Sequence, residues 1–283
     1  MRFTKFAVAG LLVAAGSALA HDPDALADIK KRGTIRLGYS ETSLPFSYKN
    51  KDGEAGGYSV EICKRIAASI QNQLKIADMK TEWVPLTPTT RLDAVAGGKV
   101  DMECGTTTVT IKRREQVDFT LPIFIDAAAL LARRTSATTM ADLQGKKVAV
   151  ADKTTTLAAV ETALKSRFIN AQVVKTQTVQ EAFEMLKDGK VDAMAGDRTA
   201  LLGTFLAAGG AENLIPLPEE LSYEPYAIVV RRGDSKLRLE ADRVIAQLYR
   251  TGDIEGVYAR WLAPLGKPTV ALITLYRMNA LPE

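Results

Sequence analysis

GKVDMECGT at Gly98–Thr106 returns as GKVDAMAGD at Gly189–Asp197, with five of the nine positions identical. Each copy follows a run with apolar residues at helical spacing: Leu92, Val95 and Ala96 before the first, and Val179, Ala182, Phe183 and Leu186 before the second. Glycine ends the helix and a short strand begins. The pattern predicts one helix–turn–strand unit used twice; the alternative is that GKVD is a common turn and the match is chance. Because the copies end differently, in Thr106 and Asp197, we expect two similar lobes that present different polar groups across a cleft.

Strands and helices alternate around both copies. The first half predicts strands Thr34–Gly38, Thr81–Leu86 and Val100–Cys104 with helices Tyr58–Asn72 and Pro88–Ala96. The second half predicts strands Lys147–Ala151, Ala171–Thr176 and Val191–Ala195 with helices Thr154–Lys165, Val179–Lys187 and Arg198–Ala208. A strand at Tyr226–Arg231 and helices around Lys236–Arg250 and Ile254–Trp261 follow. This alternation favours an α/β fold with mostly parallel sheets, in which ligands bind beyond the carboxyl ends of the strands.

The N-terminus has the pattern of a secretory signal peptide. Its parts are the basic residues Arg2 and Lys5, the apolar stretch Phe6–Ala15 and the small-x-small cleavage site Ala18–Ala20. The apolar stretch is short for a membrane span, which needs ~20 residues, and no cysteine follows it to carry a lipid anchor. We therefore expect residues 1–20 to be removed, leaving a soluble periplasmic chain that begins near His21.

Composition excludes some classes of function. Removing Arg2 and Lys5 lowers the formal charge from +4 to about +2, and the basic residues are spread along the chain, so nothing supports nucleic-acid binding. The two cysteines, Cys63 and Cys104, favour a disulfide in an oxidising compartment, and the alternative is a pair of buried thiols. Together with the single, terminal His21 they do not make a tetrahedral metal site. We expect no metal and no cofactor.

Polar groups follow each copy of the repeat. After the first come Thr106, Thr107 and Thr108, then Thr110, which can cap a short helix with Arg113 in its first turn. Hydroxyls, free backbone N–H groups and a guanidinium suit a carboxylate; the alternative is an N-cap beside a solvated arginine. After the second copy, Asp197 suits an ammonium group or caps the next helix. The loop Asp152–Thr156 has the same two interpretations. Together these groups describe a clamp for a zwitterion.

The order of these features resembles the periplasmic solute-binding proteins of the polar amino-acid class, family 3, the receptor components of ABC importers. The segments that carry the resemblance are Gly38–Tyr48, Gly57–Glu61, Arg91, Gly98–Arg113, Lys147–Thr156 and Val191–Asp197. The nearest subgroup is that of the glutamate/aspartate receptors, which have a similar Pro-Phe-Ser-Tyr loop and a Glu-Cys-Gly-hydroxyl-Thr-Thr run.

The resemblance implies a type II, two-lobed fold. A first lobe would span 21–125, a second 126–224, and 225–283 would return to the first, with crossings near Ile125–Ala127 and Tyr223–Tyr226. An amino acid would bind between the lobes and close them, and a membrane permease would recognise the closed form. The expected protein is a monomer, not an enzyme, whose partners are a small amino acid and the permease.

The resemblance also implies roles for single residues. Arg113 would hold the ligand α-carboxylate, helped by Thr106, Thr108 and the Thr154/Thr155 loop, and Asp197 would receive the α-ammonium. Arg91 would face a side-chain carboxylate. Ser43 belongs to the same set, and Tyr58, with Phe46 and Tyr48, is a candidate for stacking on the aliphatic part of the ligand, against the alternative of core packing.

Three positions depart from the subgroup. Ser40 stands in place of a second arginine, Pro88 in place of a hydroxyl near Arg91, and Thr178 in place of a histidine. Glutamate or aspartate is the expected ligand, and with one arginine fewer glutamine or another polar amino acid is the alternative. A periplasmic enzyme of the cyclohexadienyl dehydratase type is the competing class. It would need a general acid or base in the cleft, for which Glu103 and Glu41 are candidates. A signalling or adhesion role is a further alternative.

Overall fold

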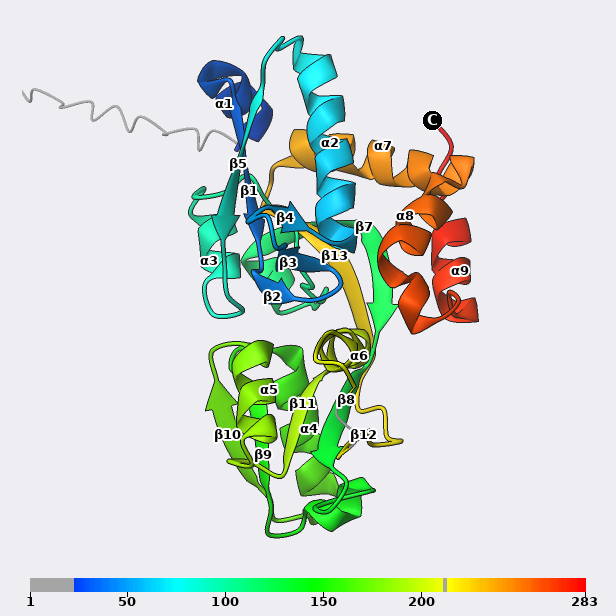
Figure 1. Cartoon of the computed structure of the whole chain (residues 1–283). Coiled ribbons are helices and arrows are strands. Elements are labelled where there is room, and N and C mark those ends of the chain that lie inside the picture. The colour runs from blue at the N-terminus through cyan, green and yellow to red at the C-terminus, as the bar shows by residue number, and fades with distance from the viewer. Residues whose placement is uncertain (1–22, 211–212) are drawn as a thin grey trace, which may run out of the picture.

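The computed structural model of the chain describes residues 23–210 and 213–283, so the predicted signal peptide and His21 lie outside the described residues. Two five-stranded sheets of the same topology form its two lobes (Figure 1). The predicted two-lobed α/β architecture is confirmed. Among the described residues no helix combines the length and hydropathy that a membrane crossing requires.

The first sheet has the order β5-β1-β6-β13-β7 and the second the order β10-β9-β11-β8-β12. The first consists of β5 (Lys80–Pro85), β1 (Thr34–Tyr39), β6 (Met102–Glu103), β13 (Glu224–Arg231) and β7 (Val117–Asp126). The second consists of β10 (Gln172–Thr176), β9 (Lys147–Ala151), β11 (Ala193–Asp197), β8 (Ala128–Arg133) and β12 (Leu214–Pro216). In both, the first three strands pair in parallel and the others antiparallel. Pairing is therefore mixed rather than mostly parallel, because the strands that carry the chain between the lobes run against their neighbours.

The chain changes sheets twice. It leaves the first between Asp126 of β7 and Ala128 of β8, and it returns between Pro216 of β12 and Glu224 of β13. Glu224 and Asp126 are register partners, so the two crossings lie side by side. We propose lobe boundaries at these crossings. A small sheet of β2 (Thr42–Ser43), β3 (Ser47–Lys49) and β4 (Ala55–Gly56) adds to the first lobe.

Helices cover the sheets with their apolar faces. The largest cluster of buried residues draws on α1 (Ala25–Arg32), α2 (Tyr58–Leu74), α7 (Ser235–Thr251), α8 (Asp253–Leu262) and α9 (Val270–Met278). In the second lobe, α4 (Thr155–Ser166), α5 (Val179–Lys187) and α6 (Arg198–Ala207) pack on the sheet. The sequence analysis missed α1 and α9, although each begins with an ordinary capping side chain, Asp24 and Thr269.

The two GKVD copies play the same structural role. They follow α3 (Arg91–Ala96) and α5, and their glycines, Gly98 and Gly189, have φ of 68° and 71°, a left-handed conformation that favours glycine. Their aspartates accept a hydrogen bond from a backbone N–H in the first half of the neighbouring parallel strand: Asp101 from Arg36 of β1 at 2.8 Å and Asp192 from Lys147 of β9 at 3.0 Å. The repeat is therefore a structural unit and not a chance match.

Cys63 of α2 and Cys104, which follows β6, form the predicted disulfide, which joins residues 41 apart in sequence. Both are fully buried in the core of the first lobe. The bond ties α2 to the strand end that carries the threonine run.

We predict that the double variant Cys63→Ala/Cys104→Ala is less stable than the parent by roughly 3–4 kcal/mol, because the bond limits the entropy of an unfolded loop of this length. Denaturant unfolding with and without a reductant measures the difference. The reductant should destabilise the parent and leave the double variant unchanged. Equal midpoints for the oxidised parent and the double variant would contradict the prediction.

Candidate functional site

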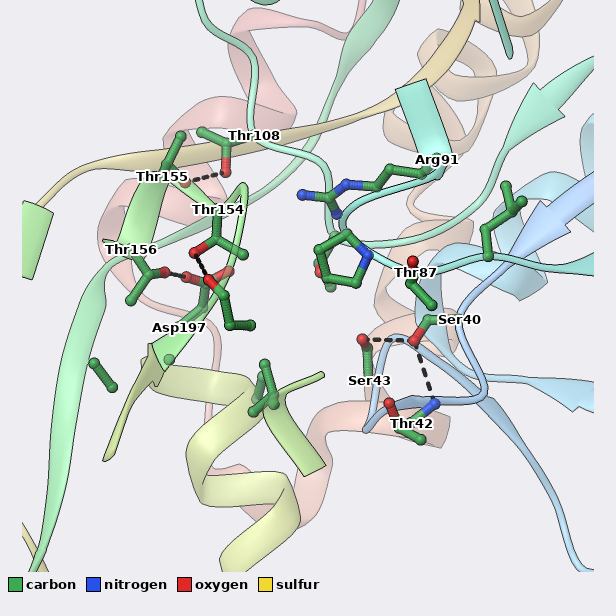
Figure 2. A pocket seen from close by; sticks show the side chains of 18 of the residues that line it. Ser40, Thr42, Ser43, Thr87, Arg91, Thr108, Thr154, Thr155, Thr156 and Asp197 are labelled. Carbon is green, nitrogen blue, oxygen red and sulfur yellow. Dashed lines mark hydrogen bonds between the residues drawn. The ribbon is translucent and has the colours of Figure 1, made fainter. Parts of the chain in front are cut away.

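A pocket lies between the two lobes at the carboxyl ends of the parallel strands (Figure 2). Residues of the first lobe that line it are Ser40, Thr42, Ser43, Leu86, Thr87, Pro88, Arg91, Glu103, Thr106 and Thr108. Those of the second are Ala151, Thr154, Thr155, Thr156, Val179, Ala195, Gly196, Asp197, Ala200 and Thr204. Seven of the nine predicted ligand-binding residues therefore line one pocket: Ser43, Arg91, Thr106, Thr108, Thr154, Thr155 and Asp197.

Hydrogen bonds bridge the pocket from lobe to lobe. The hydroxyls of Thr108 and Thr155 are 3.3 Å apart, and Thr155 also donates to Oε2 of Glu224 at 2.6 Å. A direct contact of this length across a cleft requires the two lobes to be close together. The structure is therefore a closed form of the two-lobed fold.

Arg113 lies behind Thr108, outside the lining of the pocket. Its backbone N–H donates to the hydroxyl oxygen of Thr110 at 3.1 Å, and its Nη1 donates to the carbonyl oxygen of Thr108 at 2.7 Å. Burial and the nearby charge of Arg91 lower the pKa of Arg113 to about 10, so the guanidinium stays protonated at neutral pH. Arg113 does not itself appear in the lining, but the turn that holds it contributes Thr106 and Thr108.

Arg91 begins α3 and is 8% exposed. Its guanidinium forms no hydrogen bond or ion pair with any residue that the structure describes, and Nε is buried without a partner. In Figure 2 the guanidinium extends from α3 toward the middle of the pocket. The charge of Arg91 opposes the rise that burial causes in the pKa values of Glu103 and Asp197, but neither carboxylate is close enough to form an ion pair with it. A buried guanidinium without hydrogen-bond partners is costly, so this part of the pocket suits an acceptor or a negative group.

Asp197 ends β11 on the opposite wall. It occupies the N-cap position of α6 but makes no capping hydrogen bond, so the capping alternative is wrong for this residue. Its carboxylate instead accepts hydrogen bonds from Thr156 at 2.7 Å and from the hydroxyl of Tyr226. The capping interpretation is right for Thr154, which accepts from the N–H of Leu157 while also lining the pocket.

The sequence analysis missed the buried carboxylates behind Asp197. Asp126 and Glu224, at the two crossings, are 8% and 1% exposed, and the hydroxyl of Tyr226 lies 3.3 Å from Oδ2 of Asp126. None of Asp126, Asp197 and Glu224 forms an ion pair within the described part of the chain. Burial and the charge of Asp197 raise the pKa of Asp126 to about 7. The signal available in the sequence was an acidic residue at the crossing end of each of two apolar strands, Asp126 of β7 and Glu224 of β13.

Hydroxyls line the pocket beside Arg91. Ser43 donates to the hydroxyl of Ser40 at 2.8 Å, which also accepts from the N–H of Thr42 at 3.2 Å. Thr87 completes this wall. Ser40 and Pro88, noted in the sequence as departures from the subgroup, thus both face the pocket. Thr178 does not appear in its lining and caps α5 by accepting from Glu181.

The prediction that Tyr58 contacts the ligand is wrong. Tyr58 is fully buried outside the pocket, and its hydroxyl is bonded to the carbonyl of Ile123 at 2.9 Å and to Tyr276 at 2.7 Å. Its ring packs edge to face on Phe46 and Phe124, so it serves the core of the first lobe. Phe46 is also fully buried, and Tyr48 packs edge to face on Trp261.

Comparison with known proteins agrees with this architecture. The model of the bacterial extracellular solute-binding proteins, family 3, matches residues 35–264. The L-glutamate/L-aspartate-binding protein of Pseudomonas aeruginosa is 30% identical over 83% of this chain and 79% of its own. An ancestral arginine-binding protein bound to glutamine is 30% identical with a TM-score of 0.73, covering 82% of this chain and 98% of its own. An ancestral amino acid-binding protein, a precursor of cyclohexadienyl dehydratase, is 26% identical with a TM-score of 0.71, covering 84% and 99%.

We predict that Asp126→Asn stabilises the empty protein at alkaline pH. Because the pKa of Asp126 is about 7 in the fold and the ordinary value of an aspartate is 3.8, the native state keeps a proton that the unfolded state loses between these values. Its contribution to stability therefore falls as pH rises through this window. The variant should be more stable than the parent by on the order of 1–3 kcal/mol near pH 8. The gain should be smaller at pH 5 and should vanish only below about pH 4.

Denaturant unfolding of the empty protein at both pH values checks this prediction, with Asp52→Asn as the control at an exposed position. The control should show no such pH dependence. A variant that loses equal stability at both pH values would show that Asp126 is ionised throughout.

Proposed function

The chain belongs to family 3 of the bacterial extracellular solute-binding proteins, and on this premise we propose that it is an extracytoplasmic receptor for an acidic amino acid, glutamate or aspartate. The amino acid binds between the two lobes, and the closed complex delivers it to the permease of an ABC importer. The observation that carries the choice of ligand is the buried guanidinium of Arg91, which faces the pocket without a partner in the described chain.

A zwitterion with an acidic side chain complements the charges that the pocket holds apart. Its α-carboxylate fits the side formed by Thr106, Thr108 and the Arg113 turn, where helix-start N–H groups and a guanidinium favour an anion. Its ammonium fits Asp197, whose two protein donors are neutral hydroxyls. Its side-chain carboxylate fits Arg91. Arg91 and Asp197 would then each have an oppositely charged partner, which is the condition for burying charges without a large loss of free energy.

Binding and closure are one equilibrium in this proposal. The ligand contacts both lobes at once only when the cleft is closed, so it stabilises the closed form by its differential affinity for that form. The Thr108–Thr155 hydrogen bond joins the lobes in the same state. The permease would recognise surfaces of both lobes that come together on closure.

Glutamine is the second candidate ligand. Ser40 and Pro88 line the pocket, and both are uncharged, so Arg91 is the one arginine in the pocket lining. The hydroxyls of Ser40, Ser43 and Thr87 can donate to or accept from a side-chain amide. The structural relative that is bound to glutamine supports this alternative for a pocket of related fold.

A dehydratase on the same scaffold is the candidate from another class. Glu103 lines the pocket and burial raises its pKa, a property suited to a general acid. Its Oε2, however, accepts from Thr107 at 2.8 Å, a contact that holds it within its own loop. Glu41, the other candidate acid, is exposed and pairs with Lys49. Turnover of prephenate would support the enzyme, and saturable binding without turnover supports the receptor.

We predict that calorimetry and thermal shift with the amino acids and small dicarboxylates find glutamate or aspartate as the tightest ligand. Stabilisation should grow with ligand concentration by mass action, reaching about 2.7 kcal/mol at a hundredfold excess over the dissociation constant. If no amino acid stabilises the protein, the receptor proposal fails. If glutamine exceeds glutamate, the second candidate replaces the first.

We predict that Arg91→Gln weakens glutamate binding by roughly 2–4 kcal/mol, because the ligand carboxylate then lacks its buried partner, and weakens glutamine binding by less than about 1 kcal/mol. Calorimetry with both ligands gives the ratio of affinities. Arg114→Gln is the matched control, since Arg114 is exposed and lies one residue from Arg113. An unchanged glutamate-to-glutamine ratio in the Arg91 variant would rule out its side-chain role.

A further inference from the structure

Helix α6 lies at the junction of the second lobe, the first crossing and the pocket. It packs on β8 and β11 of the second lobe, and its first turn is bonded to the first crossing, with the N–H of Arg198 on the carbonyl of Ala127 at 2.8 Å. Two of its residues, Ala200 and Thr204, line the pocket. In Figure 1 it lies between the two lobes. A helix in this position travels with the second lobe and meets the first when the cleft closes.

Gly203 is the point of contact. A Cβ placed on it would lie 3.0 Å from the carbonyl oxygen of Leu44 and 3.0 Å from Cδ of Pro45, in the loop between β2 and β3 of the first lobe. These distances are tighter than ordinary van der Waals contact, and the nearest atom belongs to the backbone, which yields less readily than a side-chain tip. Gly203 itself does not appear in the lining of the pocket.

The glycine has a local disadvantage. It lies in the interior of α6 (Arg198–Ala207), where glycine is a poorer helix former than alanine. Its φ is not among the positive values, so the backbone conformation does not require glycine. The three atoms nearest to a Cβ at this position all belong to Leu44 and Pro45 of the first lobe, and none belongs to the second lobe. The close approach of the other lobe is therefore the physical reason for glycine here.

We propose that Gly203 is a positioning residue for lobe closure: the missing side chain lets α6 reach the Leu44–Pro45 loop, and so sets how far the cleft can close on its ligand. This inference rests on the proposed receptor function. A side chain at residue 203 acts as a wedge that penalises the closed form and leaves the open form and each lobe unaffected.

Substitutions of Gly203 should change ligand affinity and the stability of the empty protein in different ways. Gly203→Ala should raise the melting temperature of the empty protein by roughly 1–4 °C through helix propensity, and it should weaken ligand binding by about 3–10-fold. Gly203→Leu should weaken binding by about 30-fold or more, because its side chain cannot fit the closed gap. If glycine were needed only for packing within the second lobe, both variants would instead lower the melting temperature of the empty protein.

The experiment uses the mature chain with L-glutamate, and with L-aspartate and then L-glutamine if glutamate does not bind. Calorimetry gives affinity, thermal unfolding gives stability, and small-angle scattering with and without saturating ligand gives the contraction on closure. Ala207→Leu, on the exposed end of the same helix, is the control and should bind and contract like the parent. Gly203→Leu should contract less than the parent.

The outcomes are distinct. A parent that binds none of glutamate, aspartate and glutamine overturns the proposed function, and this inference with it. If the parent binds and the Gly203 variants show the same affinity and the same contraction as the parent, the inference is overturned and the proposed function stands. Weaker binding by Gly203→Ala together with an unchanged or higher melting temperature supports it, and this variant decides the question if Gly203→Leu does not fold.

Discussion

The closed cleft is organised by buried charged groups that form no ion pairs with one another within the described chain. Arg91 has no partner among the described residues, and Asp126, Asp197 and Glu224 share hydroxyl and backbone donors instead of cations. Charges held apart in this way are costly in an empty pocket. They are favourable when one small molecule supplies the missing opposite charges, which links the energy of binding directly to the energy of closing.

The scaffold keeps these charges on separate bodies. Two sheets of the same topology place the ends of β6 and β11 toward each other, and the GKVD unit anchors each end through an aspartate bonded to the neighbouring strand. The disulfide ties the first of these ends to α2. The crossings at Asp126 and Glu224 join the lobes next to the carboxylate cluster. The same few residues therefore belong both to the crossings and to the cluster of carboxylates beside the pocket.

Most of the features that could be predicted from the sequence follow from local patterns of residues. Helical spacing and glycine placement located the α5 and β11 pair. Polar residues after each strand located Thr106, Thr108 and Asp197 in the pocket lining, and the family resemblance located Arg91 there. The failures have a different origin. An aromatic residue such as Tyr58 has the same sequence pattern whether it faces a ligand or a core, and only its hydrogen bonds to Ile123 and Tyr276 decide.

The sequence by itself determined the two-lobed α/β plan, the repeated unit and the cysteine pair, because these depend on periodicity, turn residues and compartment. Only the tertiary structure decided which polar groups are left unpaired, that Asp197 faces Thr156 and Tyr226 instead of capping α6, and that Gly203 meets the other lobe. The physical reason is range. Helix and strand signals act over a few residues, whereas burial, charge pairing and close approach depend on segments that are distant in the chain and meet only on folding.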